Sequence, residues 1–295
     1  MEIADTIARH ALAILLIIAA LALAATFTVW RLIERYGRQL ADIASRAWNA
    51  TRSSSAASWL KDVPVLGKLL TGTLTVGRSL GVYALLAFAS SFLLLGLFFE
   101  LADEIGLDED LARFDAALAQ SLAAHASREL LQAFAAITYL GDRDFLMALG
   151  TVVAIALFIR KEQLLGIAWV ISTSAGALLN VALKALFERA RPVHDHGVVV
   201  EDGWSFPSGH ASGALLVYGL LAYFVIRLAP PRWHLPVAIA CVALVVFVGF
   251  SRVVLQVHYL SDVLAGYASA GAWTLLCIAG LEAERLRRNG AMHRE

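Results

Sequence analysis

Three short polar stretches stand out in an otherwise apolar chain, because their side chains could handle a phosphate group. The stretches are Lys184–Pro192 (KALFERARP), Pro207–His210 (PSGH) and Ser251–Asp262 (SRVVLQVHYLSD). The cations in the first and third stretches suit a phosphate, and histidines can transfer protons or act as nucleophiles. Charged residues at the ends of lipid-facing segments are costly, so such groups commonly mark a functional site.

The first stretch combines two cations with a helix-ending proline. Lys184 and Arg191 are seven residues apart, so on a continuous helix they share a face, about 10 Å apart along the axis. Pro192 is expected to end that helix. A lone lysine near a helix end is typical of a side chain that extends toward water, but the pair followed by proline favours an anion site.

The second stretch is expected to begin a helix at Pro207, Ser208 and Gly209. Free backbone N–H groups and the helix dipole favour an anion at such a start. The Ser208 hydroxyl adds a donor, and Gly209 lets the backbone come close to a ligand. A simple helix cap explains this stretch equally well, so it is a weak signal on its own.

The third stretch pairs a histidine with a carboxylate one helical turn away. His258 and Asp262 are four residues apart, so the carboxylate can reach one imidazole nitrogen. That contact fixes the tautomer and leaves the other nitrogen free to attack. Arg252 lies upstream in the same stretch and adds a third cation.

The composition indicates an integral membrane protein. The chain is 59% hydrophobic and 16% charged, with a mean hydropathy of +0.70, whereas soluble domains are about 25% charged. The formal net charge is zero, which disfavours nucleic acid as a partner. Cys241 and Cys277 lie in apolar runs and are interpreted as small hydrophobic residues. The sequence has no metal-ligand spacing.

We interpret seven apolar segments as membrane spans, which usually need about 20 mostly apolar residues. They are Ala11–Trp30, Gly81–Phe99, Phe145–Ile159, Leu164–Phe187, Ser208–Ile226, Leu235–Leu255 and Leu260–Leu281. A cleaved signal peptide is the alternative for the first, although no basic cluster precedes it. We therefore predict an all-α, polytopic membrane helix bundle.

Two charged segments connect the first spans. Residues 31–79 are basic, with interleaved tryptophans, which predicts helices on the membrane surface that bind anionic lipid head groups. A cytoplasmic linker is the alternative. Residues 100–129 are acidic and are interpreted as a solvated loop or short helices outside the membrane.

The loop charges predict the orientation. Basic residues gather after the first, third, fifth and seventh spans, so the positive-inside rule places those ends in the cytoplasm. The three polar stretches then all lie at the outer membrane face.

Taken in order, the patterns Lys-x6-Arg-Pro, Pro-Ser-Gly-His and Ser-Arg-x5-His-x3-Asp resemble the type-2 phosphatidic acid phosphatase superfamily, the lipid phosphate phosphatases. All three motifs match without a departure. The resemblance implies a six-helix phosphatase core within residues 81–285, preceded by an extra transmembrane helix and the basic segment (1–80) and followed by a cytoplasmic tail (286–295). The soluble vanadium haloperoxidases share this fold but are disfavoured by the seven spans.

The resemblance also implies roles for individual residues. His258 is expected to be the nucleophile that forms a phosphohistidine, with Asp262 orienting it. His210 is expected to protonate the leaving group and then to activate water. The expected phosphate-binding residues are Lys184, Arg191, Ser208, Gly209 and Arg252. Family members need no metal or other cofactor.

The expected function is metal-independent hydrolysis of a lipid phosphate or diphosphate at the periplasmic face of a bacterial inner membrane. Undecaprenyl diphosphate, phosphatidylglycerophosphate, phosphatidic acid and a lipid A phosphate are all candidate substrates. The alternatives are a lipid phosphotransferase with the same site and a non-enzymatic lipid-phosphate binding or transport protein. His194 and His196 either contact a second phosphate or are solvated loop residues. The sequence leaves the oligomeric state open.

Overall fold

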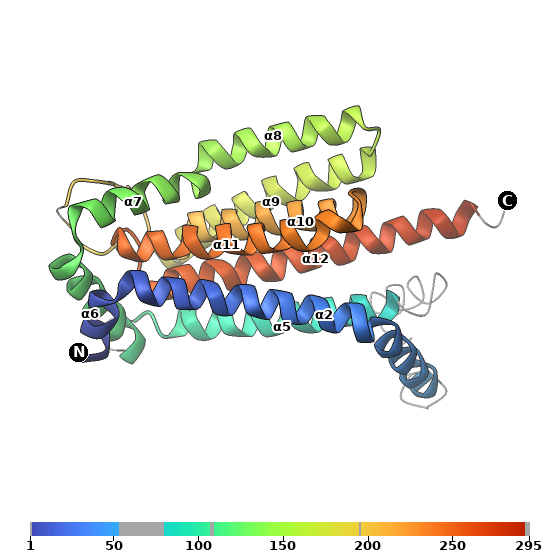
Figure 1. The fold of residues 1–295 in the computed structure, drawn as a ribbon, viewed down its shortest axis with the longest axis horizontal. Coiled ribbons are helices and arrows are strands. Elements are labelled where there is room, and N and C mark those ends of the chain that lie inside the picture. The colour runs from blue at the N-terminus through green and yellow to red at the C-terminus, as the bar shows by residue number, and fades with distance from the viewer. Residues whose placement is uncertain (1, 53–79, 107–108, 195, 293–295) are drawn as a thin grey trace. The chain divides into compact units, whose positions relative to one another are not determined.

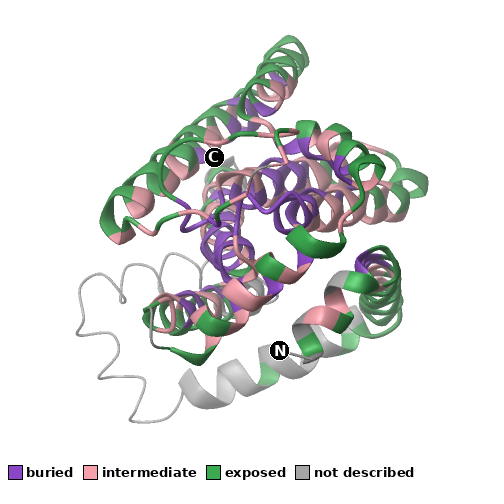
Figure 2. Cartoon of the chain, turned by 90° about the vertical axis from the view of Figure 1, so that its left-hand side faces the viewer, coloured by how far each residue is buried: buried purple, intermediate pink, exposed green. Residues whose placement is uncertain are grey.

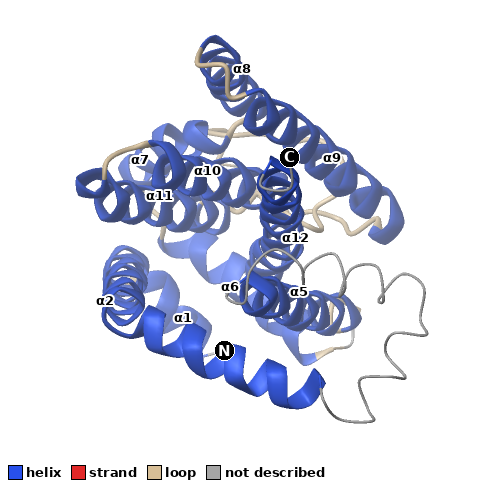
Figure 3. Cartoon of the chain, turned by 90° about the vertical axis from the view of Figure 1, so that its right-hand side faces the viewer, coloured by secondary structure: helices blue, strands red, loops and turns tan. Residues whose placement is uncertain are grey.

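The computed structural model describes residues 2–52, 80–106, 109–194 and 196–292, and every regular element in these ranges is helical (Figure 3). The helices are α1 (Glu2–Arg9), α2 (Ala11–Arg52), α5 (Leu80–Asp103), α6 (Asp110–His125), α7 (Arg128–Thr138), α8 (Arg143–Ile159), α9 (Gln163–Phe187), α10 (Gly209–Leu228), α11 (His234–Val254) and α12 (Leu260–Met292). Two 3-10 turns, η1 (Tyr139–Gly141) and η2 (Pro231–Trp233), precede α8 and α11.

The chain forms two compact units. The first comprises Met1–Phe27 and Leu93–Thr274, and the second comprises Thr28–Phe92 and Leu275–Glu295. All three polar stretches belong to the first unit. The domain boundaries expected from the sequence (1–80, 81–285 and 286–295) stay a prediction.

In the first unit, α10 packs against both α9 and α11, while α8 pairs with α9 and α7 packs on α11 (Figure 1). Close approach of the helices depends on glycine at two positions. A Cβ added at Gly249 would overlap the Tyr267 hydroxyl, and one added at Gly266 would lie 2.9 Å from the Ser208 carbonyl oxygen. Small residues of this kind let helix backbones approach in membranes. They bring α12 against α11 and against the start of α10.

Two clusters of buried side chains surround the helix ends that carry the polar stretches. The larger cluster joins the end of α11 and its following linker to α6 and α7, with Val254, Leu255, Leu118 and Phe134 at its centre. In the smaller cluster, side chains of α5 and α12 pack around Phe206, just before the Pro-Ser-Gly-His stretch. The backbone around the polar stretches is therefore embedded in packed side chains.

The second unit contains the continuations of α2, α5 and α12. Within α2, the Trp30 indole donates to Glu34 at 2.8 Å, and on α12 Arg288 pairs with Glu284 at 2.8 Å. Such pairs one turn apart support exposed helices. The sequence predicts separate surface helices from residue 31 onward, but residues 31–52 continue α2. Residues 53–79 of the expected basic segment lie outside the described residues.

Within the described part of the chain, six helical segments are long and apolar enough to cross a membrane: Ala11–Tyr36, Leu86–Asp103, Gln163–Phe187, Gly209–Leu228, Pro231–Val254 and Leu260–Arg285. They coincide with six of the seven expected spans. The remaining one is α8, whose 17 residues stand at the lower end of the usual spanning length. Exposed residues run along whole helices in Figure 2 and include large apolar side chains such as Leu93, which is 75% exposed. This pattern is typical of helices that face lipid.

Candidate active site

The three polar stretches meet at the connections α9–α10 and α11–α12 of the first unit. The predicted residues are Lys184 in the last turn of α9, Arg191 in the following loop, Ser208 at the N-cap of α10, Gly209 and His210 in its first turn, Arg252 in the last turn of α11, His258 in the next linker and Asp262 in the first turn of α12. A hydrogen bond holds the start of α10 next to the start of α12, since the Ser208 N–H donates to the Asp262 carbonyl at 2.9 Å.

The helix that carries Lys184 ends earlier than its sequence suggests. Helix α9 stops at Phe187, and Glu188 adopts a left-handed conformation with φ of 45°. Lys184 and Arg191 therefore do not share a helix face. Arg191 extends from the loop instead, and its guanidinium donates to the backbone carbonyls of Asp202 at 3.1 Å and Gly203 at 3.0 Å. These bonds fix its position without using a helix.

The contacts of His258 fix its tautomer. Its Nδ1 lies 3.3 Å from Asp262 Oδ2, and its Nε2 lies 3.1 Å from a guanidinium nitrogen of Arg191. A guanidinium can only donate, so Nε2 must be the acceptor and Nδ1 carries the proton. The nitrogen with the free electron pair therefore faces the cation.

Burial keeps His258 neutral. The side chain is 2% exposed, and this burial lowers its pKa to about 4 although Asp262 favours the charged ring. At pH 7 the imidazole is thus uncharged and able to act as a nucleophile. Asp262 is fully buried and also accepts from the Tyr259 N–H at 2.8 Å and from the Ser205 hydroxyl.

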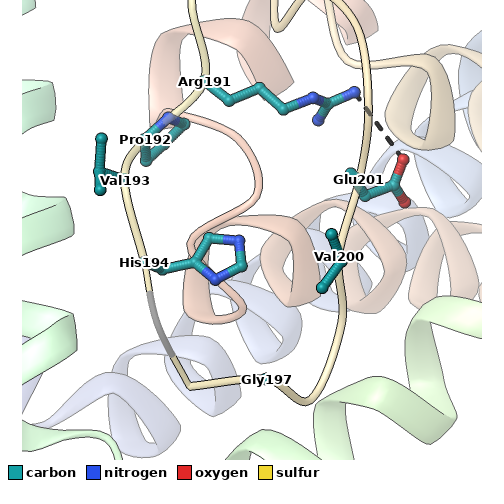
Figure 4. Close-up of a pocket in the computed structure, with 7 residues that line it drawn as sticks. All are labelled: Arg191, Pro192, Val193, His194, Gly197, Val200 and Glu201. Carbon is teal, nitrogen blue, oxygen red and sulfur yellow. Dashed lines mark ion pairs between the residues drawn. The ribbon is translucent and has the colours of Figure 1, made fainter.

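A carboxylate lies between the two arginines expected to bind phosphate. Glu201 contacts Arg252 at 2.5 Å and Arg191 at 3.8 Å (Figure 4). Burial favours the protonated acid, but Arg252 and the neighbouring cations hold the pKa of Glu201 below its usual value. Glu201 lies outside the sequence motifs, and its carboxylate occupies a position suited to a substrate anion.

Arg252 is fully buried and donates to Thr138 Oγ1 at 2.8 Å as well as to Glu201. Its Nε has no hydrogen-bond partner among the described residues. A buried N–H of this kind normally bonds an acceptor. Arg252 therefore has capacity for one more acceptor.

Lys184 and Gly209 lie together, whereas Ser208 serves the backbone. The Lys184 ammonium donates to the Trp204 carbonyl at 2.5 Å. A Cβ added at Gly209 would lie 3.9 Å from Lys184 Cε and 3.2 Å from Asn180 Oδ1, so glycine leaves room beside the lysine. The Ser208 hydroxyl accepts from the Ala211 N–H at 3.4 Å. Ser208 thus has the helix-capping role considered as the alternative for this stretch.

His210 faces a carboxylate that the sequence motifs did not identify. Its Nε2 lies 4.0 Å from Asp142 Oδ2, and the ring lies close to Gly141 in turn η1. Asp142 caps α8, because its Oδ1 accepts from the Asp144 N–H at 2.9 Å. The His210 side chain is 14% exposed, so it is more accessible than His258.

A large cavity begins at these groups and continues between apolar helices. It has a volume of about 1270 Å³, and Lys184, Arg191, Glu201 and His210 contribute to its polar lining. The apolar lining comes mainly from α8, α9 and α10. This combination suits a molecule with a charged end and a long apolar tail.

A second, smaller pocket of about 310 Å³ lies within the α9–α10 loop (Figure 4). Arg191 and Glu201 line both cavities, so they lie where the two meet. His194 lines the small pocket and stacks on His196 with ring centroids 4.2 Å apart. His196 is engaged by the backbone, since its Nε2 lies 2.9 Å from the Leu255 carbonyl and its Nδ1 accepts from the Val198 N–H.

Further polar residues behind Asp262 were missed by motif reasoning. Arg189 donates to Asp262 Oδ1 at 2.7 Å and to Asp115 Oδ2 at 3.0 Å. Asp115 belongs to the acidic segment expected to be a solvated loop or short helices outside the membrane, and it lies in the short helix α6 with its side chain fully buried. A solvated position is therefore wrong for Asp115, because α6 packs onto the end of α11 and the start of α12. The only signal for Arg189 was its place within the first polar stretch.

Comparison with known proteins identifies the family. Residues 163–285 match the PAP2 superfamily. The chain is 35% identical over 155 residues to phosphatidylglycerophosphatase B of Bacillus subtilis (strain 168), covering 52% of this chain and 74% of that protein. It is 34% identical over 131 residues to the lipid A 1-phosphatase of Rhizobium etli, covering 39% of this chain and 52% of that protein.

A solved structure shares the fold. It is the crystal structure of the first transmembrane PAP2 type phosphatidylglycerolphosphate phosphatase from Bacillus subtilis, with a TM-score of 0.62 and 30% identity. The match covers 65% of this chain and 96% of that one, so this chain has residues beyond the matched core, which is consistent with the extra N-terminal helix expected from the sequence. The chain therefore belongs to the PAP2 superfamily and is a multi-pass membrane enzyme of the lipid phosphatase class, which confirms the family, the fold class and the enzyme class predicted from its motifs.

Proposed function

We propose that this enzyme hydrolyses a lipid phosphate or diphosphate at the periplasmic face of a bacterial inner membrane, through a phosphohistidine at His258 and without a metal. The main support is the geometry of His258, whose unprotonated Nε2 lies 3.1 Å from Arg191. A nucleophile that points at a cation is well placed to attack a phosphorus atom held by that cation.

The substrate binds with its tail in the large cavity and its phosphate between the arginines. Because His258 is only 2% exposed, the phosphate reaches Nε2 after it has displaced the Glu201 carboxylate. Arg191, Arg252, Lys184 and the N-terminus of α10 then neutralise the charge on the phosphoryl oxygens. The cations that now donate to Glu201 or to backbone carbonyls donate to phosphate oxygens instead.

In the first step, His258 Nε2 forms a bond to phosphorus while the bond from phosphorus to the leaving oxygen breaks. His210 gives a proton to that oxygen. The ring of His258 keeps its Nδ1 proton and becomes positively charged, and the Asp262 carboxylate stabilises this charge. In the second step, His210 takes a proton from water, the water oxygen attacks phosphorus, and the bond to Nε2 breaks.

The orientation rests on the opposite ends of the same helices. The α8–α9 turn carries Arg160 and Lys161, the last turn of α10 carries Arg227, and the following turn η2 carries Arg232. Basic connections of this kind are typical of the cytoplasmic side. The site at the other ends of α9, α10 and α11 then faces the periplasm.

The basic residues that follow the first span have a separate role in this proposal, which is contact with anionic lipid head groups. Arg31 is exposed on α2, as is Arg35, whose guanidinium lies 5.3 Å from the Tyr36 ring centroid. Cations near a membrane surface are attracted to anionic head groups. Removal of these charges is expected to weaken binding to anionic vesicles and to leave cleavage in detergent unchanged.

Phosphate release by the purified protein in detergent tests the main proposal. A panel of phosphatidylglycerophosphate, phosphatidic acid, undecaprenyl diphosphate and a lipid A phosphate identifies the preferred substrate. We expect His258→Ala to lose about 10⁴-fold or more in kcat, and EDTA to leave the rate unchanged. His234→Ala, at the opposite end of α11, is the control. Full activity without His258, or loss of activity in EDTA, would contradict the mechanism.

Transfer of the phosphoryl group to another acceptor uses the same residues. Hydrolysis releases inorganic phosphate at the full rate when water is the only acceptor. A rate that depends on an added alcohol or lipid acceptor would favour the transferase.

A further inference from the structure

A buried arginine connects the orienting carboxylate to a second carboxylate outside the three motifs. One guanidinium nitrogen of Arg189 lies 2.7 Å from Asp262 Oδ1, and the other lies 3.0 Å from Asp115 Oδ2. The side chains of both aspartates are fully buried, and that of Arg189 is 10% exposed. Ion pairs this deeply buried persist only where the geometry satisfies every partner.

Asp115 also holds the backbone that carries Asp262. The Ser261 N–H donates to Asp115 Oδ1 at 3.2 Å, although the two residues are 146 positions apart. The Ser261 hydroxyl donates to Asp115 and accepts from Arg189 at 2.7 Å. The carboxylate of α6 therefore fixes the first turn of α12.

Tyr259 encloses the arginine from another side. Its ring centroid lies 4.3 Å from Arg189 Cζ, and its N–H donates to Asp262 Oδ2 at 2.8 Å. Asp262 thus has one oxygen bound by Arg189 and the other bound by a backbone N–H. A carboxylate held at both oxygens has little freedom to rotate away from His258.

The cluster has a net charge that matches the proposed chemistry. Two carboxylates and one guanidinium give a net charge of −1 while His258 is neutral. Burial raises the pKa of Asp115 despite its bonds from Ser261 and Arg189, which shows that its charge is costly to keep there. If Asp115 were uncharged, Arg189 would cancel the charge of Asp262. The positive ring formed on phosphorylation would then leave the cluster with a net charge of +1.

We propose that Asp115 and Arg189 are positioning residues that act through Asp262. They hold the carboxylate in the orientation that directs the His258 ring, and Asp115 preserves the net negative charge that stabilises the phosphorylated ring. This inference rests on the proposed phosphohistidine mechanism. It assigns a role in the reaction to a helix, α6, that carries none of the motifs.

Asp115→Asn tests the proposal with the smallest change of shape. We expect kcat to fall about 10- to 100-fold, as for partners that orient a reacting group, with KM within about twofold. KM is spared because Asp115 contacts none of Lys184, Arg191 and Arg252. Asp110→Asn is the control, since Asp110 lies on the same helix with its side chain 96% exposed.

A double-mutant cycle separates positioning from folding. If Asp115 acts through Asp262, then Asp115→Asn causes little further loss of kcat in an Asp262→Asn background. Losses that multiply would overturn the proposal, as would a wild-type kcat or a loss confined to KM. Should Asp115→Asn fail to fold, Arg189→Lys gives the same test, because it keeps the charge but loses the two-sided contact. We expect Arg189→Lys to lower kcat and to spare KM.

Radioactive labelling of the enzyme tests the positioning role separately from the phosphohistidine mechanism. A substrate with a radioactive phosphate is mixed with each protein, and the labelled phosphohistidine is measured after rapid quenching. Absence of label on wild-type His258 would refute the phosphohistidine mechanism and this inference with it. Label that forms at the same rate in wild type and in Asp115→Asn would refute the positioning role alone. We expect slower labelling in the variant.

Discussion

The two sides of the site are built differently. On the nucleophile side, His258, Asp262, Arg189 and Asp115 satisfy one another within a buried cluster. On the anion side, Arg191 and Arg252 are held by Glu201 and by backbone carbonyls. In the proposed mechanism, the first set keeps the contacts among its own members when substrate binds, whereas the second set exchanges its partners for the phosphate. The contrast indicates that the nucleophile is preorganised, whereas the phosphate-binding groups must give up existing partners when they bind a phosphate, which costs free energy.

Arg252→Gln is expected to have the largest effect on the anion side. In the proposed mechanism Arg252 is a buried charged donor to the transferring phosphoryl group, and losing one such donor typically lowers kcat by about 10²–10³-fold. Steady-state kinetics in detergent measure this loss. Arg232→Gln is the control, because Arg232 is exposed in turn η2 at the opposite end of α11. Equal kinetics of Arg252→Gln and wild type would remove Arg252 from the phosphate-binding set.

The low pKa of His258 predicts that activity persists into acidic solution. Burial lowers the pKa of His258 to about 4, while Asp262 raises it and Arg191 and Arg252 lower it. The ring must be neutral to attack, so kcat/KM should hold down to about pH 4 as far as His258 is concerned and then fall about tenfold per pH unit. In Asp262→Asn this limit should move to lower pH, because a group that favours the charged ring is gone. A limit that moves upward would contradict the contact.

The same pKa makes stability depend on pH. The folded state binds no proton at His258 until about pH 4, whereas an unfolded chain binds one near pH 6.5. Unfolding is therefore favoured as the pH falls from about 6.5 to 4. His258→Gln should lose part of this dependence, and the thermal midpoint measured across the range checks it. An unchanged pH dependence in the variant would show that His258 is not buried in its neutral form.

Glu201→Gln sharpens the contrast from the other direction. If the carboxylate competes with substrate phosphate, its neutralisation should lower KM about three- to tenfold, the scale of a partly exposed charge contact. Inhibition by inorganic phosphate should strengthen in parallel. Glu188→Gln is the control, since Glu188 is exposed at the end of α9. A higher KM would mean that Glu201 supports substrate binding and does not oppose it.

On the nucleophile side, the sequence predicted the contact between His258 and Asp262. On the anion side, it predicted which cations lie near the site but not their partners. His258 and Asp262 are four residues apart, so their contact follows from local geometry, although His258 itself precedes α12. Motif spacing also places Lys184, Arg191 and Arg252 near helix ends. Local spacing cannot pair Asp115 with Ser261, which are 146 residues apart, because that contact depends on how α6 packs.

The anion side also shows where charge counting fails. Glu201 and Asp115 both looked like ordinary loop or surface acids, because composition reports a charge but not its exposure. Glu201 is partly buried beside Arg252 and Asp115 is fully buried beside Arg189, and both cations come from other parts of the chain. Such pairs are determined by the tertiary fold, so the sequence alone does not predict them.

The smallest expected effect concerns turn η1, which packs beside the His210 ring. The Tyr218 hydroxyl donates to the Leu140 carbonyl at 2.7 Å, next to Gly141, which lies against the His210 ring. Tyr218→Phe removes this one bond and should cost about 0.5–1.5 kcal/mol of stability, seen as a lower thermal midpoint. Because packing around the turn stays in place, kcat should change by less than about twofold. A large loss of kcat would mean that the position of His210 depends on this one hydrogen bond. The surroundings of His210 would then be as precisely preorganised as those of His258.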